Sequence, residues 1–482
     1  MSAFAQRFRV RKPFDMLSDD ERKTVHEGAL EVLEATGMRF HSAAARDDLR
    51  AAGATVDDAN HVVRIPGSVV EDLVRKAPSE IVLAGRTPAF DLPMDGTHTY
   101  YTTDGCGISV WEPETGTRRT SRLEDIRRTA HLSDWLPHVS IYEPMVVAHD
   151  VPEAIHVIAG MKVSMETTQK HILTESTTLP EEARAQVKMA TAILGSSDEL
   201  RKRHYLSAML CTVSPLTLDA HAADAALVWA EHRVPVHITG MAQAGVSGPA
   251  TVAGDLVVNH AETLGVVCML EAHEPGAPAI YGSVLSMDAK TGSYMGGSPE
   301  SALLAAGSIE MAKYCHLPDS VGGFGSSAKI PGVQASLENA LSAMVCADVG
   351  GEVVNGLGVP DGSTLLSYEQ LLLDHEIAGM ILRIRKGFDV TRDTAAVDLI
   401  KKVGVGGSFL GQRHTLKHIR DNYVPMLWDS DPFETWIREG RKDPMQVARE
   451  KVDWILKNHE PEPLEGDTSK ALDRIVKEFS RA

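Results

Sequence analysis

The sequence predicts an α/β fold, a closed (β/α)8 barrel (TIM barrel) that carries mainly helical extensions at both ends. Between residues 96 and 386, eight short β-rich segments alternate with eight longer helical segments. This is the pattern of a barrel whose parallel strands are each followed by a helix. The chain has neither GxGxxG after a strand nor GxxxxGK[ST], the glycine loops of many nucleotide-binding sheets. An open doubly wound sheet is therefore the second choice.

The region before the barrel, residues 1–95, is expected to be an accessory, mainly helical extension. Ser18 precedes three acidic residues, which indicates the capped start of a helix that continues through Leu33. A short strand is expected at 62–66, before another helix. We expect this region to support the barrel and not to carry chemistry.

The barrel, residues 96–386, follows with its elements in strict alternation. The expected strands span 99–103, 139–144, 171–175, 205–214, 235–240, 278–283, 320–324 and 352–356. The expected helices span 123–133, 152–168, 181–195, 219–231, 249–271, 299–315, 333–349 and 368–385. Many of these helices begin with proline or an acidic residue, which helix N-termini prefer. The C-terminal extension, residues 387–482, is expected to be mostly helical, with a charged amphipathic helix at 445–458.

The composition is that of a soluble globular protein, with 43% hydrophobic and 24% charged residues. The 48 basic residues are outnumbered by 66 acidic ones, a net charge of -18, which argues against nucleic acid as a partner. No apolar stretch predicts a signal peptide or a membrane span, so a cytoplasmic protein is expected. The five cysteines lack metal-ligand spacing, so no bound metal is expected.

In a barrel of this kind, binding and catalytic residues gather at the carboxyl ends of the strands. Seven of the expected strands end in polar or glycine-rich turns. One such residue could simply cap the next helix, but so many on one face of a barrel indicate a binding site. At or near these turns we single out Tyr101, Asp104, Tyr142, Glu175, His237, Tyr281, Gly322, Gly323, Phe324, Gly325, Ser326, Gln334 and Asn355.

Conventional catalytic motifs are absent. The sequence contains no HExxH and no GxSxG, and its one SxxK run, at 326–329, is a pattern that arises often by chance. A lyase or hydrolase of the same fold that uses Asp104 or Glu175 remains an alternative.

Several short motifs occur in a fixed order along the chain. They are Tyr281-Gly282, residues 287–292 (MDAKTG), 297–300 (GSPE), 326–331 (SSAKIP), 367–374 (SYEQLLLD) and 408–418 (SFLGQRHTLKH). On these motifs the chain resembles the trimethylamine methyltransferase family, from about residue 20 to about residue 460. The resemblance implies a barrel enzyme that moves a methyl group from a methylated amine to the cobalt of a separate corrinoid protein.

The chain agrees with the need for such a partner, because it lacks a DxHxxG cobalamin-binding signature: the run Asp219-Ala220-His221 has no following glycine. Family members that act on trimethylamine carry pyrrolysine near the segment that corresponds to residues 323–326, where this chain has standard residues only. The chain therefore resembles the branch that acts on quaternary amines such as glycine betaine. A further difference is Asn355-Gly356, where the family pattern has a His-Asp pair.

The resemblance implies roles for the residues singled out above. Aromatic rings of Tyr101, Tyr142, Tyr281 and Phe324 would hold a quaternary ammonium by cation–π attraction. Asp104, Glu175 and His237 would contact the substrate, and Gln334, Asn355 and Gly325 would form the catalytic centre. Gly322, Gly323 and Ser326 would leave room for the corrinoid. His414 is a secondary candidate, and a homodimer is expected. A non-catalytic betaine-binding protein remains a third possibility.

Overall fold

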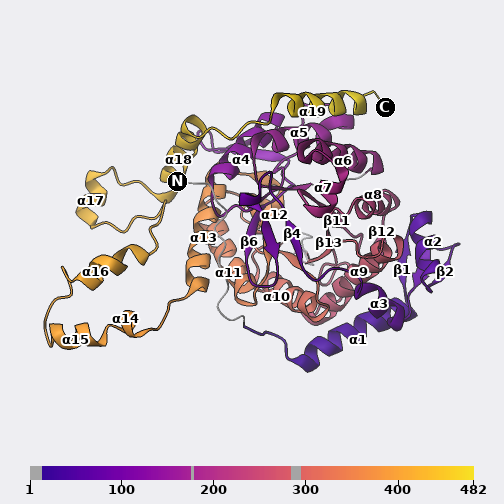
Figure 1. Ribbon diagram of the computed structural model, residues 1–482, viewed down its shortest axis with the longest axis horizontal. Coiled ribbons are helices and arrows are strands. Elements are labelled where there is room, and N and C mark those ends of the chain that lie inside the picture. Colours follow the sequence, from indigo (N-terminus) through magenta and orange to yellow (C-terminus); the bar gives the residue numbers. More distant parts are fainter. Residues whose placement is uncertain (1–13, 175–178, 284–294, 482) are drawn as a thin grey trace.

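The computed structural model describes residues 14–174, 179–283 and 295–481, and its centre is a closed barrel of eight parallel strands (Figure 1). The predicted (β/α)8 barrel is therefore confirmed. Around the barrel the strands run in the order β10-β11-β13-β14-β15-β16-β6-β9. Their bounds are β6 (Tyr100–Thr103), β9 (Ile141–Tyr142), β10 (His171–Thr174), β11 (Leu206–Cys211), β13 (Val236–Gly240), β14 (Ala279–Ser283), β15 (Asp319–Gly322) and β16 (Val353–Leu357).

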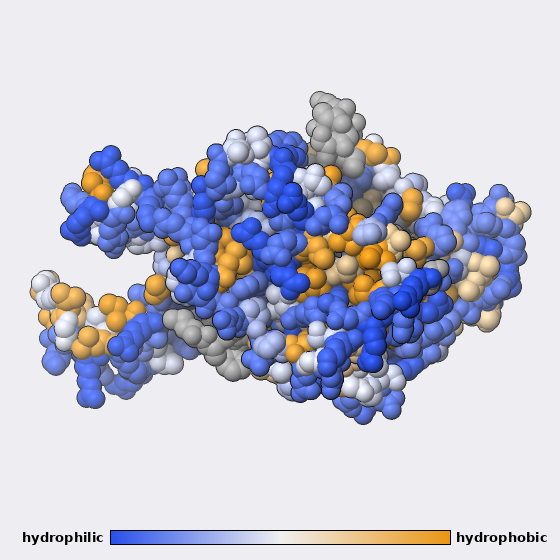
Figure 2. Space-filling model, turned by 90° about the horizontal axis from the view of Figure 1, so that it is seen from above, coloured by the Kyte–Doolittle hydropathy of each residue, from blue (hydrophilic) through white to orange (hydrophobic). Residues whose placement is uncertain are grey.

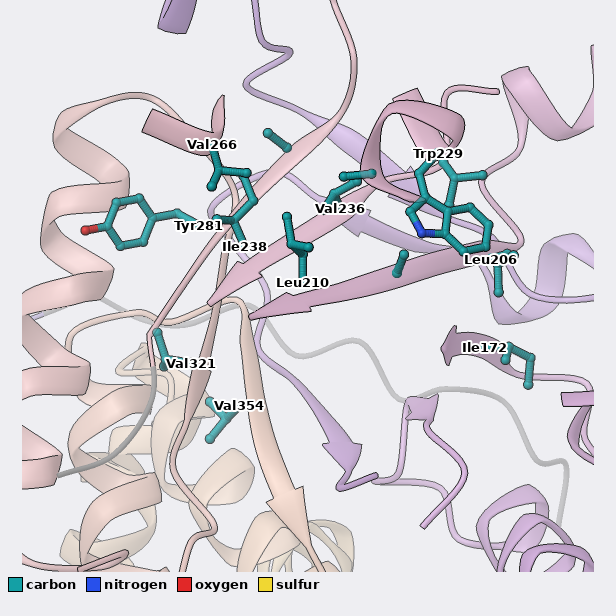
Figure 3. Close-up of a cluster of buried hydrophobic side chains, with 14 of the residues drawn as sticks. Ile172, Leu206, Leu210, Trp229, Val236, Ile238, Val266, Tyr281, Val321 and Val354 are labelled. Carbon is teal, nitrogen blue, oxygen red and sulfur yellow. The ribbon is translucent and has the colours of Figure 1, made fainter. Parts of the chain in front are cut away.

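Each barrel strand is followed by one of the eight predicted helices, and these form the outer ring. They are α4 (Leu123–Trp135), α5 (His156–Thr167), α6 (Pro180–Leu194), α8 (Ala220–Glu231), α9 (Val252–His273), α10 (Pro299–Tyr314), α11 (Val333–Asp348) and α13 (Tyr368–Lys386). The helices pack on the apolar residues that point outward from the strands. Figure 3 shows this layer, which includes Ile172, Leu210, Ile238, Val321 and Val354.

The N-terminal region packs against the outside of the barrel, chiefly on α9. Its first helix, α1 (Asp19–Ala35), begins with the expected capping box, in which Ser18 and Glu21 satisfy each other's backbone N–H groups. The region then contains β1 (Met38–Phe40), α2 (Ala43–Ala51), β2 (Thr55–Asp57), β3 (Val62–Arg64) and α3 (Gly67–Val74). Strand β1 also pairs with β12 (Thr217–Leu218), which comes from the loop after β11.

A hairpin of β4 (Ile81–Leu83) and β5 (Leu92–Met94) closes the amino end of the barrel. Its side chains pack with Tyr100, Ile141 and Ile280, which point into the barrel from the amino ends of β6, β9 and β14. This plug leaves the carboxyl ends of the strands as the open end.

The C-terminal region is helical, as predicted, and has two parts. Helices α14 (Arg392–Ala395), α15 (Val397–Val403), α16 (Arg413–His418) and α17 (Phe433–Arg438) project away from the barrel (Figure 1). The predicted amphipathic helix is α18 (Pro444–Asn458), which packs on α13 and α4, and α19 (Gly466–Phe479) packs on α5 and α6. Lys451 of α18 lies over the rings of Trp135 and Trp454, 4.6 and 4.2 Å from their centroids. No helix within the described ranges is long and apolar enough to cross a membrane.

One buried lysine ties the ring to the barrel. The Nζ atom of Lys170, just before β10, donates to the carbonyl oxygens of Ser133, Leu136 (2.6 Å) and Val139 (2.5 Å). These carbonyls lie at the end of α4 and in the turn that leads to β9. Lys170 therefore satisfies backbone acceptors that the helix end leaves unpaired, and it does so with only 1% of its surface exposed.

We predict that Lys170→Met lowers the free energy of unfolding by roughly 3 kcal/mol, because three buried carbonyls lose their donor. Urea denaturation followed by circular dichroism measures the change. Lys188→Met, on helix α6, is the control and should leave the midpoint unchanged. Equal midpoints for wild type and Lys170→Met would contradict this role.

Candidate active site at the carboxyl end of the barrel

The loops that follow the strands build a cover at the open end. The chain after β6 forms β7 (Ser109–Glu112) and β8 (Thr117–Thr120), which pair with β17 (Leu365–Leu366). Next to them α12 (Pro360–Ser363) has left-handed backbone at Asp361, Gly362 and Ser363, with φ of 57°, 63° and 65°. Backbone hydrogen bonds from Asp361 and Gly362 to the carbonyls of Ala328 and Ser326, 2.9 and 2.8 Å long, hold this turn in place.

Beneath this cover, three neighbouring strands bring four polar side chains together. Strands β16, β6 and β9 are consecutive in the barrel, and Thr102 pairs with Ile141 in register. Thr102 lies two residues after Tyr100, whose side chain points into the barrel, so the Thr102 side chain points inward as well. Asp104 and Glu143 directly follow β6 and β9, and Asn355 lies in β16 beside the same part of β6.

Asp104 is the best-anchored member of this group. Its Oδ2 atom accepts a 2.5 Å hydrogen bond from Ser363 Oγ, and it also accepts from the backbone N–H groups of Gly105 and Cys106. Burial nevertheless raises the pKa of Asp104 above its usual value, and these donors only partly oppose the shift. A bound cation would stabilise the charged form further.

Glu143 is buried, with 5% of its surface exposed, and lies against the backbone that follows Asp104. A Cβ atom on Gly105 would lie 2.5 Å from Glu143 Oε1, so any larger residue at this position would displace the Glu143 side chain. Thr103 Oγ1 donates to the Glu143 carbonyl and accepts from its N–H, both at 2.8 Å. These bonds join the ends of β6 and β9, so Asp104 and Glu143 follow adjacent strand ends.

Sequence reasoning did not single out Glu143, although a signal existed. It is the acidic residue that follows Ile141-Tyr142 inside an expected strand, immediately before Pro144. An acid at the carboxyl end of a barrel strand fits the rule that selected Asp104. Thr102 was also missed. Its side chain is fully buried, and its Oγ1 has no hydrogen-bond partner among the described residues.

Asn355 is half-buried and held from two sides. Its Oδ1 atom accepts from Ser320 Oγ at 3.1 Å, and its carbonyl accepts from the N–H groups of Gly323 (3.2 Å) and Phe324 (2.9 Å). Asn355 and Gly322 are register partners on β16 and β15. These two predicted residues therefore lie at the barrel end near Asp104.

The expectation that the tyrosines at the strand ends face the mouth is wrong. Tyr142 donates to the carbonyl of Ile126 on α4, and Tyr281 Oη lies 2.9 Å from His260 Nδ1 on α9. Figure 3 shows the Tyr281 ring pointing away from the strands toward the outer helices. Tyr101 is fully buried and packs edge-to-face on Phe324, with ring centroids 5.5 Å apart. These four rings lie between barrel wall and helices, where a substrate cation does not reach them.

His237 also lies away from the mouth. Its side chain points into the half of the barrel nearer the amino ends of the strands, where its Nε2 is 3.0 Å from Ser207 Oγ. The same hydroxyl is 2.7 Å from Nε2 of His171, whose Nδ1 lies 3.0 Å from the carbonyl of Ala84, beside the plug. Burial lowers the pKa of both histidines to about 3, so both are neutral at physiological pH. This placement argues against the expected contact of His237 with substrate.

The glycine-rich segment after β15 serves packing more than ligand access. A Cβ atom on Gly323 would lie 2.4 Å from Val354 Cγ1. Gly325 is buried, and its carbonyl would lie 3.0 Å from a Cβ atom on Gly297. The segment therefore does not provide the open space expected for a corrinoid.

Ser326 and Gln334 are both engaged by one carboxylate on α11. Ser326 Oγ and Gln334 Nε2 donate to the two oxygens of Glu338, each at 2.7 Å. Gln334 is exposed on the first turn of α11, and Ser326 is buried. Both side chains shape the loop after β15 in this structure. The predicted residue Glu175 and the motif at 287–292 lie outside the described residues.

The described residues also form two histidine clusters that could hold a metal, both away from the mouth. One joins His26, His260 and Cys315 outside the barrel, and the other joins Asp393, His414 and His418 in the C-terminal region. In the first, His26 Nδ1 is 3.0 Å from His260 Nε2, which continues the hydrogen-bond chain from Tyr281. The run 408–418, so prominent in the sequence, lies on this distant surface.

At the mouth itself, the groups brought together are two carboxylates, a hydroxyl and an amide. This set would attract a cation and could accept hydrogen bonds from it. It offers no activated serine, cysteine or lysine nucleophile among these four residues. The chemistry it supports is therefore binding and orientation of a small positively charged molecule.

The chain is similar to proteins of one family over nearly its whole length. The family model for trimethylamine methyltransferase (MTTB) matches residues 2–480. The trimethylamine methyltransferase MttB of Desulfitobacterium hafniense (strain DSM 10664 / DCB-2) is 34% identical over 96% of this chain and 93% of its own length. A glycine betaine methyltransferase of Desulfitobacterium hafniense (strain Y51) is 29% identical over 96% of each chain.

Among solved structures, the monomethylamine methyltransferase MtmB of Methanosarcina barkeri aligns with a TM-score of 0.54. The alignment covers 97% of this chain and 88% of MtmB, at 11% identity, and so shows the shared fold alone. Membership rests on the family model and on the 34% identical relative. The chain therefore belongs to the trimethylamine methyltransferase family, and it is a methyltransferase.

Proposed function

We propose that this enzyme takes a methyl group from a small quaternary amine and passes it to the Co(I) of a corrinoid carried by a separate protein. The observation that carries the proposal is the pair of carboxylates, Asp104 and Glu143, at the ends of neighbouring barrel strands. A carboxylate pair beneath a cover of loops would hold a permanent cation without donating a proton to it. The relatives named for trimethylamine and glycine betaine support an amine as methyl donor.

The proposed reaction asks little acid–base chemistry of this chain. When the carbon–nitrogen bond of a quaternary ammonium breaks, the amine leaves as a neutral molecule with the bonding electron pair. The Co(I) corrinoid supplies the nucleophile. The enzyme has to orient the cation and exclude water. Asp104 and Glu143 would place the charged end, and Asn355 would bind a polar tail.

The rim of the mouth fits a protein partner. Exposed apolar side chains stand on four loops that follow β6, β11, β13 and β15. They are Ile108, Val213, Val246 and Ile330, with 53 to 58% of their surface exposed. Apolar groups grouped around a binding site are typical of a docking surface. We propose that the corrinoid protein docks on this rim, which would bring its cofactor over the carboxylates.

The direct test is methylation of free cob(I)alamin, followed by absorbance, with a panel of methyl donors. The panel contains glycine betaine, proline betaine, carnitine, choline, a sulfonium analogue and trimethylamine. We predict turnover with at least one quaternary amine and no demethylation when cobalamin is omitted. Substrate consumption without cobalamin would indicate a lyase or hydrolase, and binding without product would indicate a betaine-binding protein. Either result contradicts the proposal.

We predict that Asp104→Asn raises KM for the quaternary amine about tenfold, the effect of losing about 1.4 kcal/mol of binding energy. Burial raises the pKa of Asp104, so the wild-type KM should increase as pH falls toward that raised pKa and the carboxylate is protonated. In the Asp104→Asn variant, KM should no longer increase as the pH falls. Glu114→Gln, at an exposed position of the turn between β7 and β8, is the matched control. An unchanged KM and pH profile in Asp104→Asn would exclude Asp104 from the cation site.

Docking on the rim predicts a defect that depends on the methyl acceptor. Ile330→Asp should slow methyl transfer to a corrinoid protein by about tenfold or more, because the new aspartate puts a charge into an apolar contact. The corrinoid protein used is one that the wild-type enzyme methylates. Transfer to free cob(I)alamin should be unchanged. Val82→Asp, a 40% exposed position on the plug at the opposite end of the barrel, should affect neither rate. A loss of both activities in Ile330→Asp would argue against rim docking.

A further inference from the structure

Three metal-ligating side chains meet outside the barrel, where the N-terminal region packs on the helical ring. His26 lies on α1, His260 lies on α9, and Cys315 directly follows α10. One ligand atom from each residue lies within 4.8 Å of the other two. Helix α1 packs on both α9 and α10 (Figure 1). The three side chains therefore stand where a peripheral helix meets two helices of the barrel.

The distances between the ligand atoms are close to those of a tetrahedral zinc site. His26 Nδ1 lies 3.0 Å from His260 Nε2 and 3.9 Å from Cys315 Sγ. Around a tetrahedral Zn²⁺, with bonds of about 2.0 to 2.1 Å to nitrogen and about 2.3 Å to sulfur, the same pairs would be about 3.3 and about 3.6 Å apart. Small side-chain shifts would therefore admit the ion.

The second nitrogen of His260 already has the partner that a metal-binding histidine needs. His260 Nδ1 lies 2.9 Å from Tyr281 Oη on β14. A proton on Nδ1 that is donated to this hydroxyl leaves the lone pair of Nε2 directed at His26. Burial lowers the pKa of His260 to about 3, so its imidazole is neutral at physiological pH and keeps this lone pair. Tyr281 therefore orients a ligand at this site.

The ligand-bearing helices are held together before any ion binds. Glu310 on α10 accepts hydrogen bonds from the backbone N–H groups of Met16 and Leu17, the second 2.8 Å long. Arg22 on α1 also donates to Glu310, at 3.4 Å. These bonds fix the start of α1 against the helix that Cys315 follows, so little ordering would be needed to complete the site.

Solvent reaches the site from one side. His26 and Cys315 are half-buried, whereas His260 is fully buried. Burial lowers the pKa of His26, and the negative charges of Glu71 and Glu27 partly oppose this shift. The same charges would favour a bound cation. An ion can therefore enter from the exposed side, where water would supply a fourth ligand.

The second histidine cluster lacks these properties. Asp393, His414 and His418 belong to α14 and α16, in the projecting region at the left of Figure 2, which stands apart from the barrel in solvent. Asp393 is already paired with Lys417 Nζ at 2.5 Å. A metal ion would have to displace this lysine. The cluster around His260 is therefore the stronger candidate.

We propose that His26, His260 and Cys315 bind one Zn²⁺ ion, which joins helix α1 to α9 and α10. The ligand atoms are Nδ1 of His26, Nε2 of His260 and the thiolate of Cys315, whose proton is released to solvent on binding. Two imidazoles and a thiolate suit zinc and not the hard ions Mg²⁺ and Ca²⁺. The site is independent of the proposed methyl transfer. Cysteine spacing did not predict it, because the three ligands are far apart in the sequence.

The test is Zn²⁺ binding by tag-free protein, measured by mass spectrometry of the metal after dialysis and by competition with a chromogenic chelator. Wild type should keep about one Zn²⁺ per chain. His26→Asn and Cys315→Ser should each bind Zn²⁺ at least about 100-fold more weakly, because each loses one of three protein ligands. Circular dichroism checks that both variants are folded. His414→Asn/His418→Asn, in the second cluster, is the matched control and should bind Zn²⁺ like wild type.

Co²⁺ provides a second readout, because a thiolate bound to Co²⁺ gives a charge-transfer absorption band in the near ultraviolet. The band should be present in wild type and absent in Cys315→Ser. Cys106→Ser, which removes an exposed cysteine, should keep it. Excess Zn²⁺ should also raise the Tm of wild type and leave that of His26→Asn unchanged, since only the folded site binds the ion.

Two results would overturn the proposal. One is a wild-type protein that keeps no Zn²⁺ after dialysis. The other is wild-type Zn²⁺ affinity in either His26→Asn or Cys315→Ser, which would place any bound ion elsewhere on the chain. Neither result depends on methyl transfer, so each can be told apart from a failure of the proposed function.

Discussion

The alternation of side chains along the strands of the closed barrel determines which residues form the core and which residues reach the mouth. In a closed barrel one set of residues points to the helices and the other set points inward. The outward set, from Ile172 to Val354, forms the core with the outer helices. The inward set ends at the open mouth, so the last inward positions of β16, β6 and β9 decide what a ligand meets. There the chain places Asn355, Thr102 and the carboxylates that follow.

Most of the architecture could be predicted from the sequence, because strands and helices differ in length, residue type and capping. All eight barrel strands and the helices after them lie within a few residues of their expected positions, and the capping box at Ser18 is present. The site was harder to predict, because all four residues of Tyr100–Thr103 are buried. A strand buried on both faces shows no polar alternation, so the sequence could not tell whether Tyr101 or Thr102 faces the mouth.

The same limit explains the other errors. Tyr142 and Tyr281 stand at strand ends, but their hydroxyl groups contact α4 and α9, and only a three-dimensional structure shows which way they point. The glycines after β15 suggested open space for a ligand, whereas Gly323 is required by the approach of Val354. Asp104 was predictable, since an acid directly after a strand reaches the mouth whichever face the strand presents.

The mouth combines the half-buried Asp104 and the buried Glu143 with a rim of separate apolar side chains, as expected where a small cation is enclosed and a protein docks transiently. Family membership supports the chemistry at the mouth.

The central claim is that Asp104 and Glu143 hold the charge of the methyl donor. Calorimetric titration with tetramethylammonium and with neopentyl alcohol, a neutral molecule of similar branched shape, tests it most directly. We expect saturable binding of the cation and no measurable binding of the alcohol, with the cation signal lost in an Asp104→Asn/Glu143→Gln variant. Equal binding of cation and alcohol, or full binding of the cation by that variant, would show that these carboxylates do not hold the charge.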